Sequence, residues 1–209
     1  SSSLLFSPFG AAHSPRTSFL SANGPGLKIC TPATPRDAKG LLKTAVRDNN
    51  PVLVLECELF YSHKGMVEDE DTDLLIPLGE AEIKRGGSDV TIICYAQTVP
   101  MALAAAEQLA GAKINAEVID LRSIKPLDWP AVFESVSKTH RVVIAEQDRP
   151  FCGVGAEIAF RIQQEIFDAL DAPIQRIAQE DVPMPYNERL EQAVLPKAEK
   201  IVAAVKKIC

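Results

Sequence analysis

The sequence predicts an α/β protein with a doubly wound, mostly parallel sheet, and three observations carry this prediction. Short apolar runs such as Arg141–Ala145 are hydrophobic on both faces, as strands covered by helices on each side are. Segments with helical periodicity separate these runs. Residues Ala116–Gln147 contain the complete unit, which is an apolar strand, a helix opened by Pro126 and Pro130, and a second apolar strand. Repetition of this unit is typical of doubly wound folds.

The first 26 residues differ in composition from the rest of the chain. They are rich in serine, carry the single basic residue Arg16 and contain no acidic residue. This bias resembles an organelle transit peptide. A disordered leader explains it equally well, and both interpretations stay open.

Residues 27–60 form the first strand–helix–strand segment. Leu27–Cys30 is predicted as a strand, and Thr34 is predicted to cap a helix that has Pro35 at its first position. Val52–Leu55 is apolar throughout and is predicted as a buried strand. The piece is too short to be a domain alone.

Residues 61–87 are predicted to be a linker. Their acidic run between Glu68 and Asp73 raises the possibility of a divalent metal site, because hard cations bind carboxylate oxygens. The run lacks the spacing and the glycine of a calcium-binding loop, so a solvated linker is favoured.

Residues 88–209 are predicted to form a second domain. Its strands are expected at Val90–Tyr95, Ala116–Leu121, Arg141–Ala145 and Ile174–Ala178. Its helices are expected at Thr98–Leu109, after Pro130, and at Ala156–Leu170, Arg189–Ala193 and Lys197–Lys207. Thr98 is the predicted N-cap of the first of these helices.

Composition excludes some classes of function. A net charge of −6 argues against a nucleic-acid-binding surface. No apolar run reaches the roughly 18–20 residues that span a bilayer. The five cysteines form no Cys-x-x-Cys pair, which favours buried free thiols in a reducing compartment.

Few residues are candidates for catalysis or for ligand binding. Gly153 and Gly155 precede a helix and could offer backbone N–H groups to an anion, although tight packing explains them as well. Glu56 and Glu58 would share one face of a strand. His140 is expected to be a strand-end residue. These residues do not complete an active site.

Several stretches carry a resemblance to a known family. They are PGLKICTPATPRDAKGLLKTAVRDNNPVLVLECEL, AEVIDLRSIKPLD, GVGAEIAFRI and LDAPIQRIAQEDVPMPY. The sequence resembles the beta subunit of the thiamine-dependent first component of 2-oxoacid dehydrogenase complexes. GVGAEI and DVPMPY are most similar to the pyruvate dehydrogenase branch, with the branched-chain 2-oxoacid branch second. The resemblance implies a transketolase C-terminal-like domain at 88–209, preceded by a remnant of a pyrimidine-binding domain at 27–60.

The resemblance also implies an activity and partners. The family decarboxylates a 2-oxoacid with thiamine diphosphate and transfers the acyl group to a lipoyl group. Expected partners are an alpha subunit, a second beta subunit and the subunit-binding domain of dihydrolipoyl acetyltransferase, with neither nucleic acid nor membrane involved. The expected location is the mitochondrial matrix, with a plastid or a bacterial cytoplasm as alternatives.

The chain departs from the family pattern near its start. Asn23 stands where the family has an active-site histidine, and the half of the subunit with the cofactor-contacting glutamate has no counterpart in this sequence. The expectation is therefore a truncated beta subunit or a paralogue without catalysis. No catalytic or cofactor-binding residue is assigned, and the chain alone is expected to be inactive. The alternative is a docking or assembly module.

Two family sites map onto residues of this sequence. The loop after the first helix resembles a potassium-binding loop, with Ala45, Val46, Asp48 and Asn50 as implied ligands. Backbone carbonyls at a helix C-terminus suit a cation. Asp171 resembles the aspartate that docks the basic subunit-binding domain of the acetyltransferase, or else it is only a turn residue.

Overall fold

The computed structural model describes residues 22–67 and 73–209. The transit-like interpretation of residues 1–26 falls almost wholly on residues outside these ranges. The same is true of the acidic run between residues 68 and 72, to which the metal hypothesis applied.

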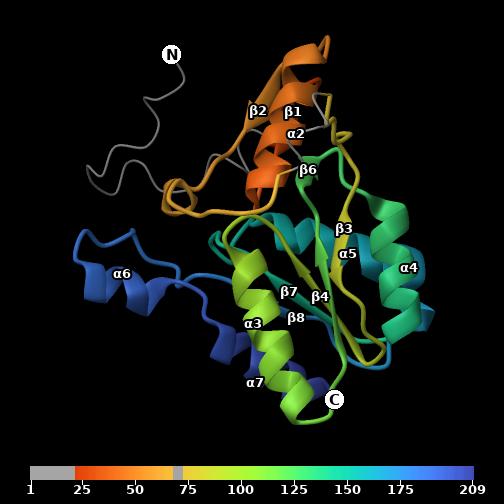
Figure 1. Cartoon of the computed structure of the whole chain (residues 1–209). Coiled ribbons are helices and arrows are strands. Elements are labelled where there is room, and N and C mark those ends of the chain that lie inside the picture. Colours follow the sequence, from red (N-terminus) through yellow and green to blue (C-terminus); the bar gives the residue numbers. More distant parts are fainter. Residues whose placement is uncertain (1–21, 68–72) are drawn as a thin grey trace.

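The strands form two sheets, one above the other in Figure 1. The smaller sheet has the order β2-β1-β6, and the larger has the order β3-β5-β4-β7-β8. The strands are β1 (Lys28–Cys30), β2 (Val52–Val54), β3 (Glu82–Arg85), β4 (Val90–Cys94), β5 (Ala116–Asp120), β6 (Ser123–Lys125), β7 (Val142–Ala145) and β8 (Gln175–Ile177). The α-helices are α2 (Pro35–Arg47), α3 (Thr98–Gly111), α4 (Trp129–Thr139), α5 (Val154–Ile166), α6 (Glu188–Val194) and α7 (Ala198–Ile208).

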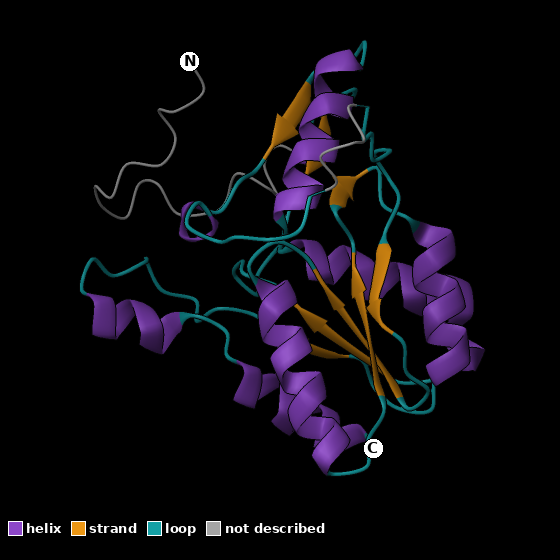
Figure 2. Cartoon of the chain, in the orientation of Figure 1, coloured by secondary structure: helices purple, strands orange, loops and turns teal. Residues whose placement is uncertain are grey.

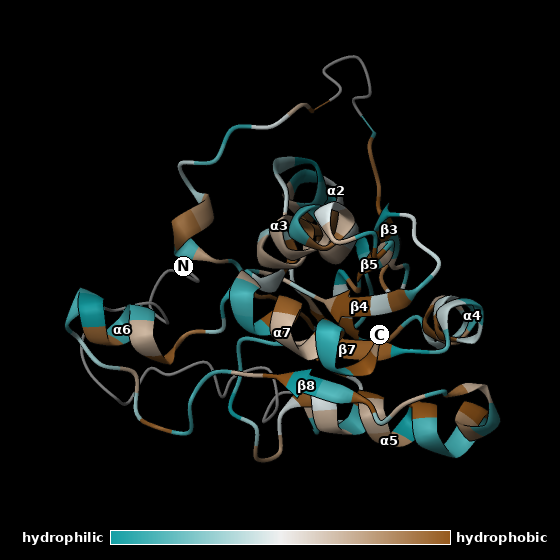
Figure 3. Ribbon diagram, turned by 90° about the horizontal axis from the view of Figure 1, so that it is seen from below, coloured by the Kyte–Doolittle hydropathy of each residue, from teal (hydrophilic) through white to brown (hydrophobic). Residues whose placement is uncertain are grey.

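The larger sheet is doubly wound, as predicted. Strands β4, β5, β7 and β8 pair in parallel, and β3 pairs antiparallel with β5 at one edge. Helices α3 and α7 share one hydrophobic cluster with the sheet, and α4 and α5 share the cluster on the opposite face. Figure 2 shows the strands between these helices, and Figure 3 shows α7 and α5 on opposite sides of β7 and β8.

Strand β4 explains why the sequence pattern was so clear. Its neighbours Ile92 and Ile93 belong to the two opposite clusters, and both side chains are fully buried. Because successive side chains point to opposite faces, a strand covered on both sides must be apolar at every position. The predicted fold class is confirmed.

The smaller sheet contains the predicted first strand–helix–strand segment. Thr34 is the N-cap of α2, and its Oγ1 accepts a hydrogen bond from the N–H of Asp37 at 3.1 Å. Strand β2 pairs in parallel with β1 alone and therefore forms an edge of the sheet. The prediction that Val52–Leu55 is fully buried was wrong, because an edge strand has a neighbour on one side only, and these residues are half-buried.

Strands β3 and β6 were not predicted. β6 pairs antiparallel with β1, so that Ile29 lies opposite Lys125. The ammonium of Lys125 also donates to the carbonyl oxygens of Ala22 and Gly24, at 2.6 and 2.9 Å. The residues after β5 therefore complete the smaller sheet, and the two sheets share one continuous stretch of chain.

Two helix boundaries differ from the prediction. Gln97 takes the N-cap position of α3, while the hydroxyl of Thr98 turns inward and lies 2.8 Å from the carbonyl oxygen of Tyr95 and 2.9 Å from that of Ala145. The hydroxyl thus joins β4 to β7 instead of capping the helix. The helix predicted at Ala156–Leu170 is α5, which ends at Ile166 and continues as a short 3-10 turn.

The cysteines do not all follow the prediction of buried thiols. Cys30 and Cys94 are buried and Cys57 is half-buried, but Cys152 and Cys209 are exposed. Within residues 22–67 and 73–209, no helix is long and apolar enough to cross a membrane.

Candidate functional sites

The loop after α2 is the first candidate site. Helix α2 ends at Arg47, and the N–H of Asp48 returns to the carbonyl oxygen of Ala45 at 3.3 Å. The carboxylate of Asp48 accepts hydrogen bonds from the backbone N–H and the side-chain amide of Asn50, at 2.8 and 3.0 Å. Three of the four residues assigned to a potassium site are thus joined in one turn, and Val46 is exposed beside it.

Lys28 was not anticipated at this loop. Its ammonium lies 2.5 Å from Oδ2 of Asp48. The hydrogen bonds from Lys28 and Asn50 hold the pKa of Asp48 at about 2, well below its ordinary value. The carboxylate is therefore ionised at neutral pH and attracts cations. The same ammonium already supplies a positive charge, so a potassium ion would have to share the carboxylate with it.

The turn at Asp171 is the second candidate site. The N–H of Asp171 donates to the carbonyl oxygen of His140 at 2.9 Å, and Nδ1 of His140 lies 2.8 Å from the carbonyl oxygen of Ala169. His140 is the left-handed C-cap of α4, with a φ of 62°. The prediction of a strand-end residue was therefore close in position but missed the capping role. Two hydrogen bonds fix the turn, and 56% of the Asp171 side chain is exposed.

Arg141 faces Asp171, with Nη2 lying 3.5 Å from Oδ2. Beside them an open groove of about 560 Å³ runs along α5 and the following turn. Phe160 and Phe167 line this groove and are 61% and 59% exposed. An exposed carboxylate beside exposed aromatic rings suits a partner with both basic and apolar groups. Such a partner would have to displace Arg141 from Asp171.

Gly153 is the N-cap of α5 and Gly155 lies in its first turn, and the N–H of Gly155 binds an anion that belongs to the protein itself. The N–H of Gly155 donates to Oε2 of the fully buried Glu146 at 2.8 Å. Arg176 forms an ion pair with Oε1 of the same carboxylate. Burial raises the pKa of Glu146 in spite of both contacts. Both predictions for Gly153 and Gly155 hold in part, because the N–H faces an anion and the packing is tight.

Glu56 and Glu58 do not share a face of a strand. Strand β2 ends at Val54, and Glu58 begins a 3-10 turn, so the predicted alternation stops before either residue. Oε2 of Glu56 accepts a hydrogen bond from the hydroxyl of Tyr61 at 3.1 Å. No acid–base pair is formed by these two glutamates.

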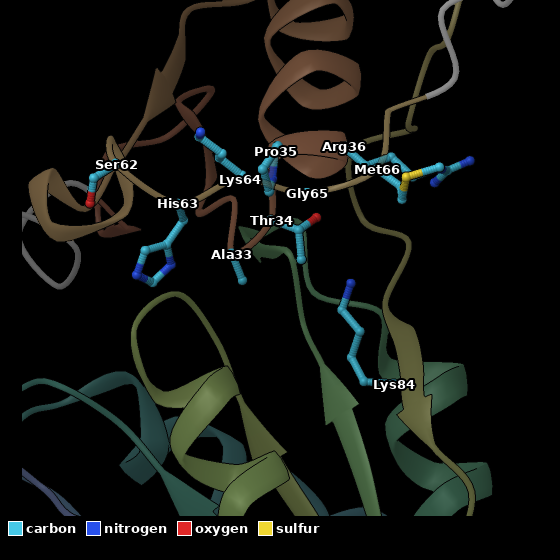
Figure 4. Close-up of a pocket in the computed structure, with 10 residues that line it drawn as sticks. All are labelled: Ala33, Thr34, Pro35, Arg36, Ser62, His63, Lys64, Gly65, Met66 and Lys84. Atoms are coloured by element: carbon cyan, nitrogen blue, oxygen red, sulfur yellow. The ribbon is translucent and has the colours of Figure 1, made fainter.

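A pocket of about 770 Å³ opens at the N-terminus of α2 (Figure 4). The polar side chains that line it are those of Thr34, Arg36, Ser62, His63, Lys64 and Lys84. Figure 4 shows Lys84 extending from below toward Thr34, with His63 on the opposite side of the pocket. Its lining is basic and contains no carboxylate, although acidic residues lie directly behind Lys84.

Comparison with known proteins identifies the family. Residues 79–201, more than half of the 209-residue chain, match the family model described as "Transketolase, C-terminal domain". The chain belongs to the transketolase C-terminal domain family. The match contains all five strands of the larger sheet and four of its helices, and part of α7.

The transketolase C-terminal domain occurs here in a chain similar to pyruvate dehydrogenase beta subunits. The chain is 48% identical, over 94% of its length, to "Pyruvate dehydrogenase E1 component subunit beta, mitochondrial" of Caenorhabditis elegans. It is also 48% identical, over 96% of its length, to the beta-1 subunit of Arabidopsis thaliana. A Rhizobium meliloti beta subunit is 48% identical over 88% of the chain.

The chain spans only part of the length of these relatives, 57% of the Caenorhabditis protein, 56% of the Arabidopsis protein and 40% of the Rhizobium protein. A solved structure titled "Split gene transketolase, inactive beta4 tetramer" is similar in fold, with a TM-score of 0.77 at 28% identity. That match covers 95% of this chain and 62% of the solved one.

The cofactor implied by the family does not fit the described residues. A diphosphate group is commonly bound through Mg²⁺, which takes oxygen ligands from one or two carboxylates. Residues 22–67 and 73–209 contain no group of three or more His, Cys, Asp or Glu placed to hold a metal ion. The pocket at α2 offers no carboxylate to such a cation.

Proposed function

We propose that this chain is a beta-subunit polypeptide of pyruvate dehydrogenase. In the assembled enzyme, pyruvate is oxidatively decarboxylated and the acetyl group is transferred to a lipoyl group of the acetyltransferase. The identity of 48% to beta subunits from an animal, a plant and a bacterium carries this proposal. The relatives named here are pyruvate dehydrogenase subunits, so the branched-chain 2-oxoacid enzyme is not favoured.

The activity is proposed for an assembly and not for the chain alone. Thiamine diphosphate would be bound mainly by residues outside those described, and an alpha subunit and a second beta subunit would complete the enzyme. Relatives with "mitochondrial" in their names support a location in the mitochondrial matrix, although bacterial relatives exist as well.

Reconstitution tests the proposal. The chain is mixed with an alpha subunit, thiamine diphosphate and a lipoylated acetyltransferase domain, and acetyl transfer from pyruvate is measured with and without a full-length beta subunit. We expect stable association with the alpha subunit and no turnover by the chain alone. Failure to associate with any pyruvate dehydrogenase subunit would contradict the proposal, and turnover by the chain alone would contradict the expected inactivity.

We also propose that Asp171 docks the basic subunit-binding domain of the acetyltransferase. The support is its exposed, doubly anchored turn beside the groove of Phe160 and Phe167. A pull-down with the isolated subunit-binding domain compares Asp171→Ala with Asp168→Ala, which removes another exposed aspartate three residues away. Retention by the Asp168 variant and loss by the Asp171 variant is expected. Equal retention of both excludes the docking role.

A potassium ion at the loop of Ala45, Val46, Asp48 and Asn50 is a third element of the proposal. The carbonyl groups at the end of α2 and the ionised Asp48 support it. The competing ammonium of Lys28 determines how it must be tested.

A further inference from the structure

Five charged side chains meet where α2 contacts the larger sheet. They are Asp37 from α2, Glu82 and Lys84 from β3, Asp120 from the end of β5, and Arg122 from the short connection between β5 and β6. Asp37, Asp120 and Arg122 are buried, while 13% of the Lys84 side chain and 38% of the Glu82 side chain are exposed. Buried charges are costly unless they are paired, so the pairing within this cluster matters for the fold.

Asp37 forms ion pairs with both cations of the cluster, although its Oδ1 makes no hydrogen bond. Its Oδ1 lies 2.8 Å from Nη2 of Arg122, and its Oδ2 lies 3.1 Å from Nζ of Lys84. The hydroxyl of Thr34 donates to the same Oδ2 at 2.6 Å. Lys84 and Arg122 also each contact Oε2 of Glu82. Two cations are therefore matched with the two carboxylates of Asp37 and Glu82.

Asp120 is the third carboxylate and has no cation of its own. Its Oδ1 accepts a hydrogen bond from the N–H of Arg122 at 3.0 Å. Its Oδ2 is buried without a hydrogen bond, and the nearest cation is the ammonium of Lys84 at 3.7 Å. On β4, the thiol of Cys94 also faces this carboxylate, but it donates to the carbonyl oxygen of Ile119.

Three carboxylates against two cations leave one negative charge in excess. We propose that Asp120 carries a proton at the junction between α2 and the larger sheet, and that loss of this proton loosens the attachment of α2. The junction then acts as a pH-sensitive latch, which we define as the contacts of Asp37, Glu82, Lys84, Asp120 and Arg122.

The titration of the individual groups supports this assignment. Burial raises the pKa of Asp120 to about 7, even though the N–H of Arg122 and the charge of Lys84 act in the opposite direction. For Asp37, burial is outweighed by the Thr34 hydroxyl, Arg122 and Lys84, and the pKa is lowered from 3.8. The pKa of Lys84 is raised from 10.5 because Glu82 and Asp37 outweigh desolvation, and burial raises that of Cys94 well above 9.0. Asp120 is thus the member of the latch that titrates near neutrality.

The sign of the effect follows from linkage. In an opened junction the carboxyl of Asp120 has an ordinary pKa of about 3.9. The closed state binds the proton more tightly, so its advantage is complete below that value, declines as the pH rises, and is gone above about 7. Titration of Asp37, whose pKa is lowered, changes the stability of the closed junction only at more acidic pH. Titration of Lys84 and Cys94, whose pKa values are raised, changes it only in the alkaline range.

The loosening should appear first in the contacts between the loop before α2 and the residues after β5. The N–H of Thr31 donates to the carbonyl oxygen of Arg122 at 2.7 Å. The backbone of Arg122 is in the left-handed region, with a φ of 54°. The N–H of Asp37 bonds to Thr34, which faces Lys84 in Figure 4. Hydrogen exchange at the amides of Thr31 and Asp37 should therefore report how often the latch opens.

Hydrogen exchange of the full chain tests the proposal. After correction for intrinsic rates, opening at Thr31 and Asp37 should increase on the order of 10²-fold between pH 5 and pH 8 and level off above about 7. Asp120→Asn removes the titrating group and should make this profile flat. Glu134→Gln, which neutralises an exposed carboxylate on α4, should keep the slope of the wild type.

A second measurement covers the possibility that Asp120→Asn does not fold. Infrared spectroscopy detects the C=O stretch of a protonated carboxyl group, which should be present at pH 6 and absent at pH 8.5. In Lys84→Met, the cation that favours ionised Asp120 is lost, so this band should persist to higher pH. The proposal is overturned by a missing band at pH 6, by a shift to lower pH in Lys84→Met, or by an unchanged exchange profile in a folded Asp120→Asn.

Discussion

The ammonium of Lys28 lies 2.5 Å from the carboxylate of Asp48, across the turn that ends α2. β1 thereby supplies a cation to the C-terminus of a helix, where carbonyl groups and the helix dipole favour positive charge. A bound potassium ion would compete with this side chain for the same carboxylate. Because of this competition, substitution of Lys28 should change how the protein responds to potassium, which allows the proposed site to be tested.

Lys28→Met should make the chain more responsive to potassium. Without added potassium the variant loses the ion pair with Asp48 and should be slightly less stable than the wild type. With potassium chloride in place of choline chloride, its melting temperature should rise more than that of the wild type. Differential scanning fluorimetry at constant ionic strength measures the difference.

Lys200→Met is the matched control, because it removes the exposed ion pair between Lys200 and Glu180 far from the loop. It should respond to potassium as the wild type does. If Lys28→Met and Lys200→Met respond alike, the loop binds no potassium.

Gly155→Ala should destabilise the protein by more than about 2 kcal/mol, because the side chain of Glu146 has no room to move. A Cβ at position 155 would lie 2.5 Å from Oε1 of Glu146, which is fully buried and paired with Arg176. Urea unfolding followed by circular dichroism measures the change.

Gly111→Ala provides the comparison for this substitution. It also lies in a helix, but a Cβ there meets nothing within 4 Å. This change should be neutral or stabilise by up to about 1 kcal/mol, through reduced entropy of the unfolded chain. Equal effects of both substitutions would mean that the contact with Glu146 is not tight in solution.

Thiol reactivity should divide the cysteines into two groups. Cys152 and Cys209 are exposed and should react with an aromatic disulfide reagent at pH 8 in the folded protein, Cys209 more slowly because partial burial raises the pKa of its thiol. Cys30 and Cys94 should react only on unfolding, because burial, together with the charge of Glu56, raises the pKa of Cys30 to about 12, and burial raises that of Cys94 well above its ordinary value. Peptide mapping after timed alkylation identifies the residues. Rapid modification of Cys94 would contradict the packing of β4.

Arg141→Met should strengthen docking of a basic partner at Asp171. Arg141 lies 3.5 Å from the Asp171 carboxylate and must be displaced by such a partner. Its removal should raise the affinity about 2- to 5-fold, the range expected for a partly exposed ion pair. Isothermal titration with the subunit-binding domain measures this change.

Arg161→Met removes another arginine, from the ion pair with Glu165 on α5, and serves as its control. An affinity gain in Arg161→Met as large as that in Arg141→Met would mean that general charge, and not the pair with Asp171, controls docking.

Local signals in the sequence were sufficient for most elements. Thr34 and Pro35 place the start of α2 correctly, since capping chemistry acts within one turn of chain. The apolar run of β7 reflects burial on both faces. β3 and β6 escaped prediction because they are short and partly polar, and because their antiparallel partners lie far away in the sequence.

The contacts of the sites could be predicted less well. Gly155 was considered both as an anion-binding position and as a packing position, but its anion, Glu146, could not be assigned without the turn between them. Lys28 and Arg141 stand opposite Asp48 and Asp171 only because strands and helices bring them there. The sequence contains no spacing pattern for pairs formed by tertiary packing.

The pairing of Ile29 with Lys125 constrains the order in which a nascent chain can fold. The partner on the second side of β1 is translated nearly a hundred residues after β1 itself. Until then, β1, α2 and β2 lack β6, and the carbonyl groups of Ala22 and Gly24 lack the ammonium of Lys125. Long-range pairing of this kind slows folding. The smaller sheet should therefore mature after β5 has been synthesised, although β1 and β2 precede β5 in the chain, and chaperones would encounter these strands while they are exposed.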